Sequence, residues 1–174
     1  LLKLKPRIVG LNPFDLEIIK LKVLRSIYDL SNARLYGAIE MACLDIQGKA
    51  IGRPVCDVLG GRLTDRILIT AYVFYQAEGG DTSWEGTSQR LVEYVTNLVE
   101  NYGLRSIKIK GGVHPPDQEV ETFITLRRRF PGLPMRLDPN SVWSVATSVR
   151  IARRLAEYDI EYLEDPTWGL AGMA

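Results

Sequence analysis

From residue 66 onward, the sequence alternates between short β-branched or aromatic segments and amphipathic segments with helical periodicity. Such alternation is typical of parallel β/α units, because consecutive parallel strands are joined by a crossover that is usually a helix. Two architectures fit: an open doubly wound sheet, or part of a (β/α)₈ barrel. A complete barrel needs about 250 residues, whereas about 108 of the 174 residues follow Arg66, which is enough for roughly half. The predicted strands are residues 67–75, 106–110, 135–138 and 160–165, and the predicted helices are residues 83–101, 116–130 and 144–158.

The first 65 residues contain no convincing strand and are predicted to be helical. Asn12 followed by Pro13 is typical of a helix start and predicts a helix over residues 12–25. Two further helices are predicted over residues 32–49 and 54–59. The apolar face of the longer one is expected to carry Leu35, Ile39, Ala42 and Ile46. We therefore expect two parts, residues 1–65 and 66–174.

The charge and cysteine content exclude several classes of protein. The 22 basic and 21 acidic residues leave a net charge of +1, which gives no electrostatic basis for binding nucleic acid or an anionic membrane. No apolar run reaches the roughly 18 residues that suggest a membrane span, and the first ten residues do not resemble a signal peptide. Cys43 and Cys56 are too few for a disulfide framework and are expected to be inert. A cytoplasmic protein is the expectation.

Polar residues occur at the ends of three successive predicted strands. Lys108 and Lys110 end one strand, Asp138 and Asn140 follow the next, and Glu164 ends the last. A spacing of two residues places both members of each pair on the same side of a strand. The carboxyl ends of parallel strands are where α/β folds place their active sites, so we expect these side chains to meet at one rim.

The chemistry of these residues suits a metal-assisted proton transfer. Carboxylate oxygens together with water and substrate oxygens are the ligands that Mg²⁺ prefers. A lysine close to a cation and to a second lysine is expected to have a lowered pKa, which allows it to act as a base near neutral pH. A base and a Lewis acid together can remove a proton next to a carboxylate. Each motif alone also has a structural interpretation, as solvated charge or a turn, so the prediction depends on their combination.

Other polar features are predicted to be structural. His114, the only histidine, is expected to be a loop residue without a role. Arg127, Arg128 and Arg129 fall in the last turn of a predicted helix, where cations favour the helix dipole, and a solvated face is expected. Neither glycine pair, 60–61 or 111–112, fits a nucleotide-binding motif.

Five stretches together resemble the enolase superfamily, most closely its glucarate dehydratase-like branch. The resemblance implies an α+β capping domain followed by a modified (β/α) barrel, with residues 1–65 as the helical part of the former and residues 66–174 as the first half of the latter. The stretches are AIEMACLDIQGKAIGRPVCDVLGG (38–61), AYVFY (71–75), IKIKGGV (107–113), RRRFPGLPMRLDPNSVWS (127–144) and YLEDP (162–166).

The resemblance also implies roles for the residues at the strand ends. Lys110 matches the lysine that acts as base at the α-carbon, and Lys108 matches its neighbour, which stabilises the enediolate. Asp138 matches the first Mg²⁺ ligand, and Asn140 matches a polar group that contacts substrate. The implied reaction is dehydration of a hexarate such as D-glucarate to a keto-deoxy sugar diacid.

Two further positions bear on substrate and metal binding. Tyr72 and Phe74 match positions near the substrate in that branch. The second metal ligand is Glu164 if the chain follows mandelate racemase-like members. If it follows glucarate dehydratase-like members, the ligand falls at or near Ala171, where the sequence has no acid.

Three hypotheses remain open from the sequence. The first is a Mg²⁺-dependent acid-sugar dehydratase represented by an incomplete chain, with a small aldarate or related acid sugar as its substrate and a homo-oligomer as its expected state. The second is a truncated, non-catalytic fragment or pseudoenzyme, because later barrel strands that would complete the site are missing. The third is an α/β domain that binds an anionic metabolite through its two lysines.

Overall fold

The computed structural model describes residues 4–24 and 30–173, and the chain divides into two compact units, residues 1–66 and 67–174. The division falls one residue from the boundary expected from the sequence. Each unit has its own hydrophobic core. The units are described separately below.

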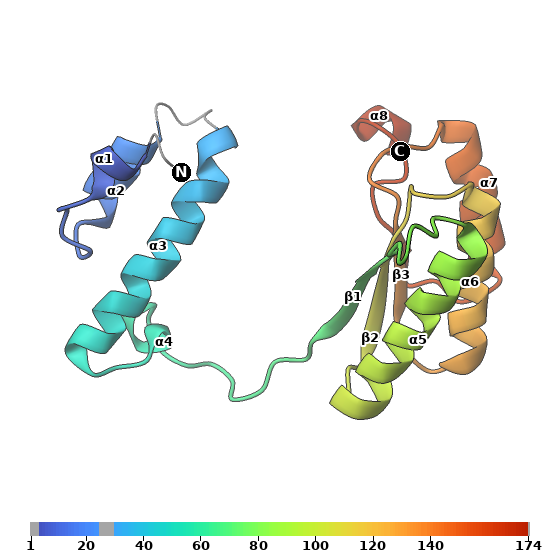
Figure 1. Cartoon of the computed structure of the whole chain (residues 1–174), viewed down its shortest axis with the longest axis horizontal. Helices are drawn as coiled ribbons and strands as arrows, with labels where there is room; N and C mark the ends of the chain where they lie inside the picture. Colours follow the sequence, from blue (N-terminus) through green and yellow to red (C-terminus); the bar gives the residue numbers. More distant parts are fainter. Residues whose placement is uncertain (1–3, 25–29, 174) are drawn as a thin grey trace. The chain divides into compact units, whose positions relative to one another are not determined.

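In the first unit, the described secondary-structure elements are all helices: α1 (Lys5–Ile8), α2 (Leu16–Val23), α3 (Leu30–Ile51) and α4 (Val55–Val58) (Figure 1). The predicted start of the helix at Asn12 is wrong. The Asn12 side chain instead accepts a hydrogen bond from the backbone N–H of Phe14 in a local turn, and the helix begins at Leu16. A short Asx-type turn competes with helix formation in this way because Asn can bond to its own neighbouring backbone.

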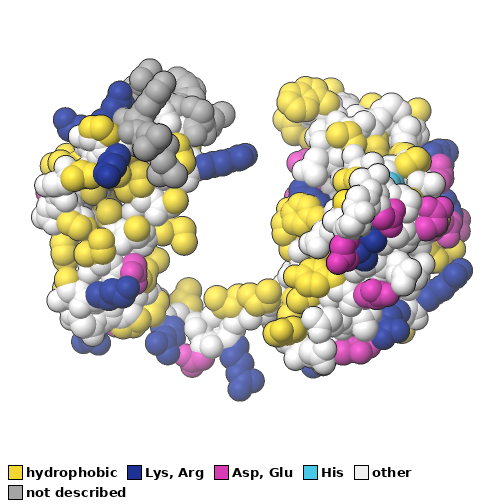
Figure 2. Space-filling view, viewed as in Figure 1, with side chains coloured by type: hydrophobic (Ala, Val, Ile, Leu, Met, Phe, Trp, Pro, Cys, Tyr) yellow, Lys and Arg dark blue, Asp and Glu magenta, His cyan; other side chains and the backbone are white. Residues whose placement is uncertain are grey.

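The predicted face of α3 is confirmed only in part: Leu35 and Ile39 pack against the core of this unit, whereas Ala42 and Ile46 are exposed. Tyr36, Cys43 and Gln47 are buried, whereas Ile46 is largely exposed. The small core of this unit consists of Leu4, Ile19, Val23, Tyr36 and Cys43. Apolar side chains are also spread over the surface of the unit, as Figure 2 shows. Because α3 is apolar around much of its circumference, periodicity alone identified only part of the side that is buried.

The second unit is a four-stranded parallel sheet with helices between its strands (Figure 1). Its strands are β1 (Thr70–Phe74), β2 (Ser106–Lys110), β3 (Met135–Asp138) and β4 (Tyr162–Leu163), paired in the order β1-β2-β3-β4. The connecting helices are α5 (Trp84–Tyr102), α6 (Pro116–Arg129) and α7 (Val145–Ala156), and a short α8 (Leu170–Met173) follows β4. The predicted extents of β2 and β3 are confirmed. The first strand is shorter than predicted, because residues 67–69 lie outside it and are exposed.

The strand order and the position of the helices decide between the two architectures left open by the sequence. Consecutive strands are neighbours, and α5, α6 and α7 lie on the same side of the sheet (Figure 1). A doubly wound sheet reverses its strand order and carries helices on both faces, whereas a barrel keeps sequential order with helices only outside. The unit therefore has the topology of successive β/α units of a barrel.

Alternation along the strands separates an apolar face from a polar one. Ala71, Val73, Ile107, Ile109 and Leu137 are fully buried against the helices, with Phe123 of α6 at the centre of the core. The residues between them point to the opposite face, because side chains alternate with a period of two. The lysines and carboxylates identified in the sequence belong to that second face.

Candidate active site

Three neighbouring strands bring the predicted polar residues together at their carboxyl ends. Lys110 is paired with Asp138 in the β2–β3 register, and Glu164 follows the last residue of β4. We refer to Lys108, Lys110, Asp138, Asn140 and Glu164 as the lysine–carboxylate cluster. The convergence predicted from the strand ends is thus observed.

Both ammonium groups are bonded to carboxylates. The Lys108 Nζ lies 2.6 Å from Glu164 Oε2 and 3.2 Å from Asp138 Oδ2. The Lys110 Nζ donates hydrogen bonds to Asp138 Oδ2 and, at 2.7 Å, to Asn140 Oδ1. The Asp138 side chain is almost completely buried, so a carboxylate shielded from water links the two lysines.

Tyr72 and Phe74 form an aromatic wall beside the cluster. The Lys108 and Lys110 Nζ atoms lie 5.5 Å and 5.7 Å from the centre of the Tyr72 ring, within the range of cation–π attraction. The Phe74 ring packs edge-to-face on Tyr72 with its centre 5.0 Å away. About half of each side chain remains exposed, 47% for Tyr72 and 48% for Phe74, so the wall has free surface beside the charged groups.

Among the protein groups of the cluster, the pKa values of both lysines are raised. Desolvation lowers the pKa of Lys110, but its hydrogen bond and charge interaction with Asp138 outweigh this, and the net shift is upward. Lys108 behaves in the same way, because Glu164 and Asp138 stabilise its charged form. The pKa of Asp138 is lowered: burial opposes ionisation, but hydrogen bonds from Lys110 and from the Asn140 backbone favour the carboxylate. The lowered lysine pKa expected from the sequence depends on a cation beside the lysine and stays a prediction; here each ammonium has a carboxylate partner.

The loops that carry Asn140 and Glu164 are bonded to each other. Asn140 and Ser141 have left-handed φ angles of 54° and 63°, and Asp165 has one of 40°. The Ser141 N–H donates to the Asp165 carbonyl at 2.6 Å, and the Asn140 N–H donates to Asp138 Oδ1 at 3.0 Å. Left-handed conformations in non-glycine residues persist only where surrounding contacts enforce them, and they are concentrated at functional sites.

The cluster offers two carboxylates to a cation. The Lys108 ammonium lies between Asp138 and Glu164 and shows that a positive group fits between these carboxylates. Among the residues that the structure describes, no group of three or more His, Cys, Asp or Glu side chains is arranged to hold a metal ion. Ala171 lies in α8 and supplies no acid there. Asp138 and Glu164 fit Mg²⁺ as a protein ligand pair, since Mg²⁺ commonly takes one or two carboxylates plus water and substrate oxygens.

Two buried charged residues of α6 were not identified from the sequence. Glu119 is fully buried, and its carboxylate accepts hydrogen bonds from the backbone of the loop after β2. Arg127, expected on a solvated face, is instead buried and donates only to backbone carbonyls. Helical periodicity could have indicated that Arg127 is buried. It lies seven residues after Val120 and four after Phe123, and therefore on the same apolar face of α6.

His114 is structural, as its contacts show. Its Nε2 lies 2.8 Å from Thr87 Oγ1, and its ring packs edge-to-face on Tyr75 at 4.8 Å. It thus links the loop after β2 to α5 and is not part of the cluster.

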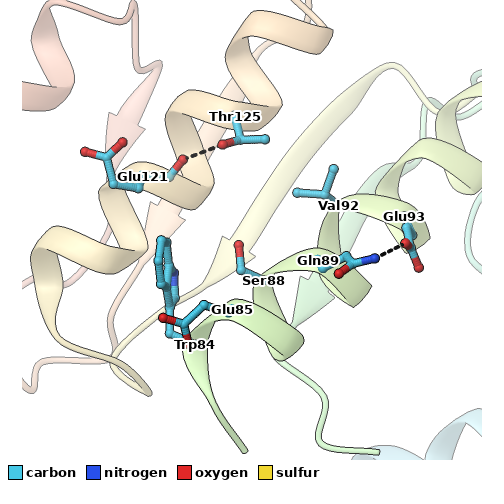
Figure 3. Close-up of a pocket in the computed structure, with 8 residues that line it drawn as sticks. All are labelled: Trp84, Glu85, Ser88, Gln89, Val92, Glu93, Glu121 and Thr125. Atoms are coloured by element: carbon cyan, nitrogen blue, oxygen red, sulfur yellow. Dashed lines mark hydrogen bonds between the residues drawn. The ribbon is translucent and has the colours of Figure 1, made fainter.

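A separate groove lies between α5 and α6, with a volume of about 510 Å³. Figure 3 shows Trp84 and Ser88 from α5 facing Glu121 and Thr125 from α6 across it. Its lining residues all belong to these two helices, which pack on the apolar face of the sheet, away from the lysine–carboxylate cluster.

Two family models match the chain. The model described as "Mandelate racemase / muconate lactonizing enzyme, N-terminal domain" matches residues 2–60, and the model described as "Enolase C-terminal domain-like" matches residues 90–174. In the part of the chain that the structure describes, no helix is long and apolar enough to cross a membrane.

Similar proteins include enzymes with different names. A probable glucarate dehydratase of Streptomyces coelicolor is 40% identical over 162 residues, which cover 87% of this chain and 37% of that protein. A chloromuconate cycloisomerase of Cupriavidus pinatubonensis is 29% identical, over 98% of this chain and 44% of its own length. A crystal structure of an enolase from Thermobispora bispora, complexed with magnesium and formate, has a TM-score of 0.78 and 41% identity, covering 98% of this chain and 46% of that one. The chain thus spans less than half the length of each.

Proposed function

The chain belongs to the enolase superfamily, and on that basis we propose that it carries part of the active site of a Mg²⁺-dependent acid-sugar dehydratase. The reaction removes a proton from the carbon next to a carboxylate and then expels hydroxide from the β-carbon. The observation that carries the proposal is the lysine–carboxylate cluster at the ends of three adjacent parallel strands. We assign residues 1–65 to the helical part of the capping domain and residues 66–174 to the first four β/α units of the barrel.

Lys110 is the proposed base, and Lys108 stabilises the negative charge that develops on the substrate carboxylate. Lys110 Nζ lies at the rim, bonded to Asp138 and Asn140. To accept a proton it must first lose one, which requires that Asp138 hold the ammonium less strongly than it does here. Asp138 and Glu164 are the proposed metal ligands.

Mg²⁺ held by these two carboxylates would supply Lewis-acid stabilisation for the enediolate oxygens. A cation bound to Asp138 would weaken the attraction of that carboxylate for the Lys110 ammonium. Asn140, which accepts a hydrogen bond from Lys110, is the proposed contact for a substrate hydroxyl. Tyr72 and Phe74 form the side wall against which a short carbon chain lies.

The proposed substrate is an aldarate such as glucarate or a related acid sugar. Two lysines and a metal ion suit a substrate with a carboxylate and neighbouring hydroxyl groups. The similarity to a probable glucarate dehydratase supports this choice. We further propose a cytoplasmic homo-oligomer, and the free Cys43 and Cys56 suit a reducing compartment.

Replacing Lys110 tests the proposed base. In the full-length protein, we expect Lys110→Ala to reduce Mg²⁺-dependent formation of keto-deoxy acid from glucarate by at least about 100-fold, the contribution typical of a general base. Lys49→Ala, which removes an exposed lysine of α3, is the matched control and should retain activity. Equal turnover by Lys110→Ala and the parent protein would exclude the lysine as base.

Isotope exchange separates dehydration from the isomerisations suggested by other relatives. In D₂O, a dehydratase releases a keto-deoxy product, whereas an epimerase or cycloisomerase converts its substrate without loss of water. Slow α-proton exchange without product, lost in Lys110→Ala, would indicate that Lys110 is a competent base for another substrate. No exchange and no product with any acid sugar would reject the dehydratase.

A non-catalytic protein is the second candidate. It is favoured by the ion pairs that occupy both lysines and by the presence of only two converging carboxylates among the described residues. The same pairing disfavours a metal-independent anion pocket, because the lysine charges are already neutralised. Calorimetric titration with glucarate in the presence of Mg²⁺ or of EDTA distinguishes the three candidates. A dehydratase binds glucarate only with Mg²⁺, and a simple anion site binds it in EDTA as well. A non-catalytic fragment binds neither glucarate nor Mg²⁺.

A further inference from the structure

We propose that Glu119 is a positioning residue for the lysine–carboxylate cluster: its buried carboxylate holds the loop after β2 and thereby sets the place of the Lys110 amine. The inference rests on the function proposed above. Glu119 lies in the first turn of α6 and touches none of the cluster residues, so it acts through the backbone that follows Lys110.

The Glu119 carboxylate is bonded to three consecutive backbone N–H groups. Its Oε2 accepts from Gly112, and its Oε1 accepts from Val113 and His114, each at 2.9 Å. The side chain is fully buried, so water does not replace these bonds when one is lost. A buried charge of this kind is tolerated only when its hydrogen bonds are satisfied, and here the loop satisfies them.

The same loop is pressed against the backbone of the Asp138 turn. The Gly111 N–H donates to the Asp138 carbonyl at 2.9 Å. A methyl group built on Gly111 would lie 2.5 Å from Glu119 Oε2, and one on Gly112 would lie 2.5 Å from the Pro139 carbonyl oxygen. The two glycines therefore fill the space between Glu119 and the turn that carries Asp138 and Asn140.

This arrangement connects Glu119 to the chemistry by a short path. Lys110 is the last residue of β2, and the segment that Glu119 fixes begins two residues later, at Gly112. A shift of this segment moves the Lys110 backbone relative to Asp138, its partner in the sheet register. Displacing a reacting group by about 1 Å can lower the reaction rate by about 100-fold. A carboxylate outside the site can therefore control the rate through the position of Lys110.

Glu119→Gln tests the inference because glutamine has nearly the same shape but offers an N–H₂ group where a second acceptor oxygen is needed. Three readouts are compared: amide hydrogen exchange at residues 111–114, the NMR signal of the Lys110 ammonium, and the kinetic constants for glucarate. We expect faster exchange at residues 111–114, a shifted Lys110 signal, and a kcat lowered by about tenfold or more with a KM changed far less. Glu121→Gln, an exposed position on the same helix, is the matched control.

A second variant covers the case in which Glu119→Gln does not fold. Glu119→Asp keeps the charge but shortens the side chain by one methylene. It should change amide exchange, the Lys110 signal and kcat in the same directions but by smaller amounts. If exchange at residues 111–114 rises while the Lys110 signal and kcat stay at parent values, Glu119 is only structural and the inference is wrong. If the parent protein converts no acid sugar, the proposed function fails, but the exchange and Lys110 signals still decide the role of Glu119.

Discussion

At the scale of single residues, Gly112 shows how tightly the site is built. Its φ of +77° is a conformation that residues with a side chain rarely adopt, and a Cβ there would meet the Pro139 carbonyl oxygen at 2.5 Å. We expect Gly112→Ala to lower the free energy of unfolding by about 1–3 kcal/mol, from backbone strain and the clash. Urea unfolding followed by circular dichroism measures this change.

Gly132→Ala is the comparison for that prediction. Gly132 has no positive φ, and a methyl group added there would meet nothing within 4 Å, so alanine should leave stability unchanged or slightly higher. Equal effects of the two substitutions would contradict the close approach of Gly112 to the Asp138 turn.

At the scale of elements, the carboxyl end of α6 depends on Arg127. Its guanidinium donates to the carbonyl oxygens of Tyr158 at 3.0 Å and Asp159 at 2.8 Å, beyond the end of α7. It also donates to Pro131 at 3.0 Å and Leu133 at 2.8 Å, in the turn before β3. One buried cation thus bonds to partly buried backbone carbonyl groups from two connections.

Arg127→Lys should therefore be strongly destabilising despite conserving the charge. A lysine ammonium cannot donate to carbonyl groups in two separate turns at once. Several of these hydrogen bonds are therefore lost, and a hydrogen bond to a charged group contributes about 1.5–3 kcal/mol. We expect a loss of about 2–4 kcal/mol in the free energy of unfolding. The exposed Arg128, replaced in the same way, should show almost no change, and a similar result at both positions would refute the structural role of Arg127.

The amino end of α6 is linked to α7 by a pH-dependent contact. Hydrogen bonds from Arg150 lower the pKa of Asp117, assisted by the charges of Arg150 and Arg154 and opposed by slight burial. Because the pKa of Asp117 is lower in the folded state, the contact stabilises the fold fully above the pKa of an unfolded Asp, about 3.9. The stabilisation is lost as the pH falls through the pKa of Asp117 in the folded protein.

Asp117→Asn should accordingly be less stable than the parent protein at neutral pH, and the difference should vanish in acid. The urea unfolding midpoints of both proteins, measured across pH 2–7, give this stability difference over the range in which a carboxylate titrates. Because the partners are about half exposed, 1 M salt should also shrink the difference. A difference that is constant with pH would show that the ion pair is not its origin.

At the scale of the whole molecule, the parallel sheet has two edges, at β1 and β4. The residues that lead into β1 are apolar and exposed, with Leu68 at 83%. An exposed, apolar strand edge favours pairing with another chain. We therefore expect self-association of the 174-residue chain.

Leu68→Lys should reduce that self-association, because it places a charge in the exposed apolar segment that leads into the edge strand β1, and charge there opposes pairing. Analytical ultracentrifugation at several concentrations gives the mass distribution, and the variant should move toward the monomer. Leu21→Lys changes the net charge equally but lies in the first unit, and it should leave the distribution unchanged. A parent chain that is monomeric at all concentrations would contradict the prediction.

The sequence alone determined which elements form the second unit and which residues meet at its rim. Strand alternation and parallel β/α order are local patterns, and they place Lys108, Lys110, Asp138 and Glu164 on one side and one end of a sheet. Only the tertiary structure decided which charges pair, and hence that the lysine pKa values rise. It also decided that Glu119 and Arg127 are buried. The partners of Glu119 are backbone N–H groups of the loop just before its helix, and Arg127 reaches carbonyl groups up to 32 residues away. Periodicity reports which side of an element is apolar, but the energy of a buried charge depends on neighbours that periodicity does not specify.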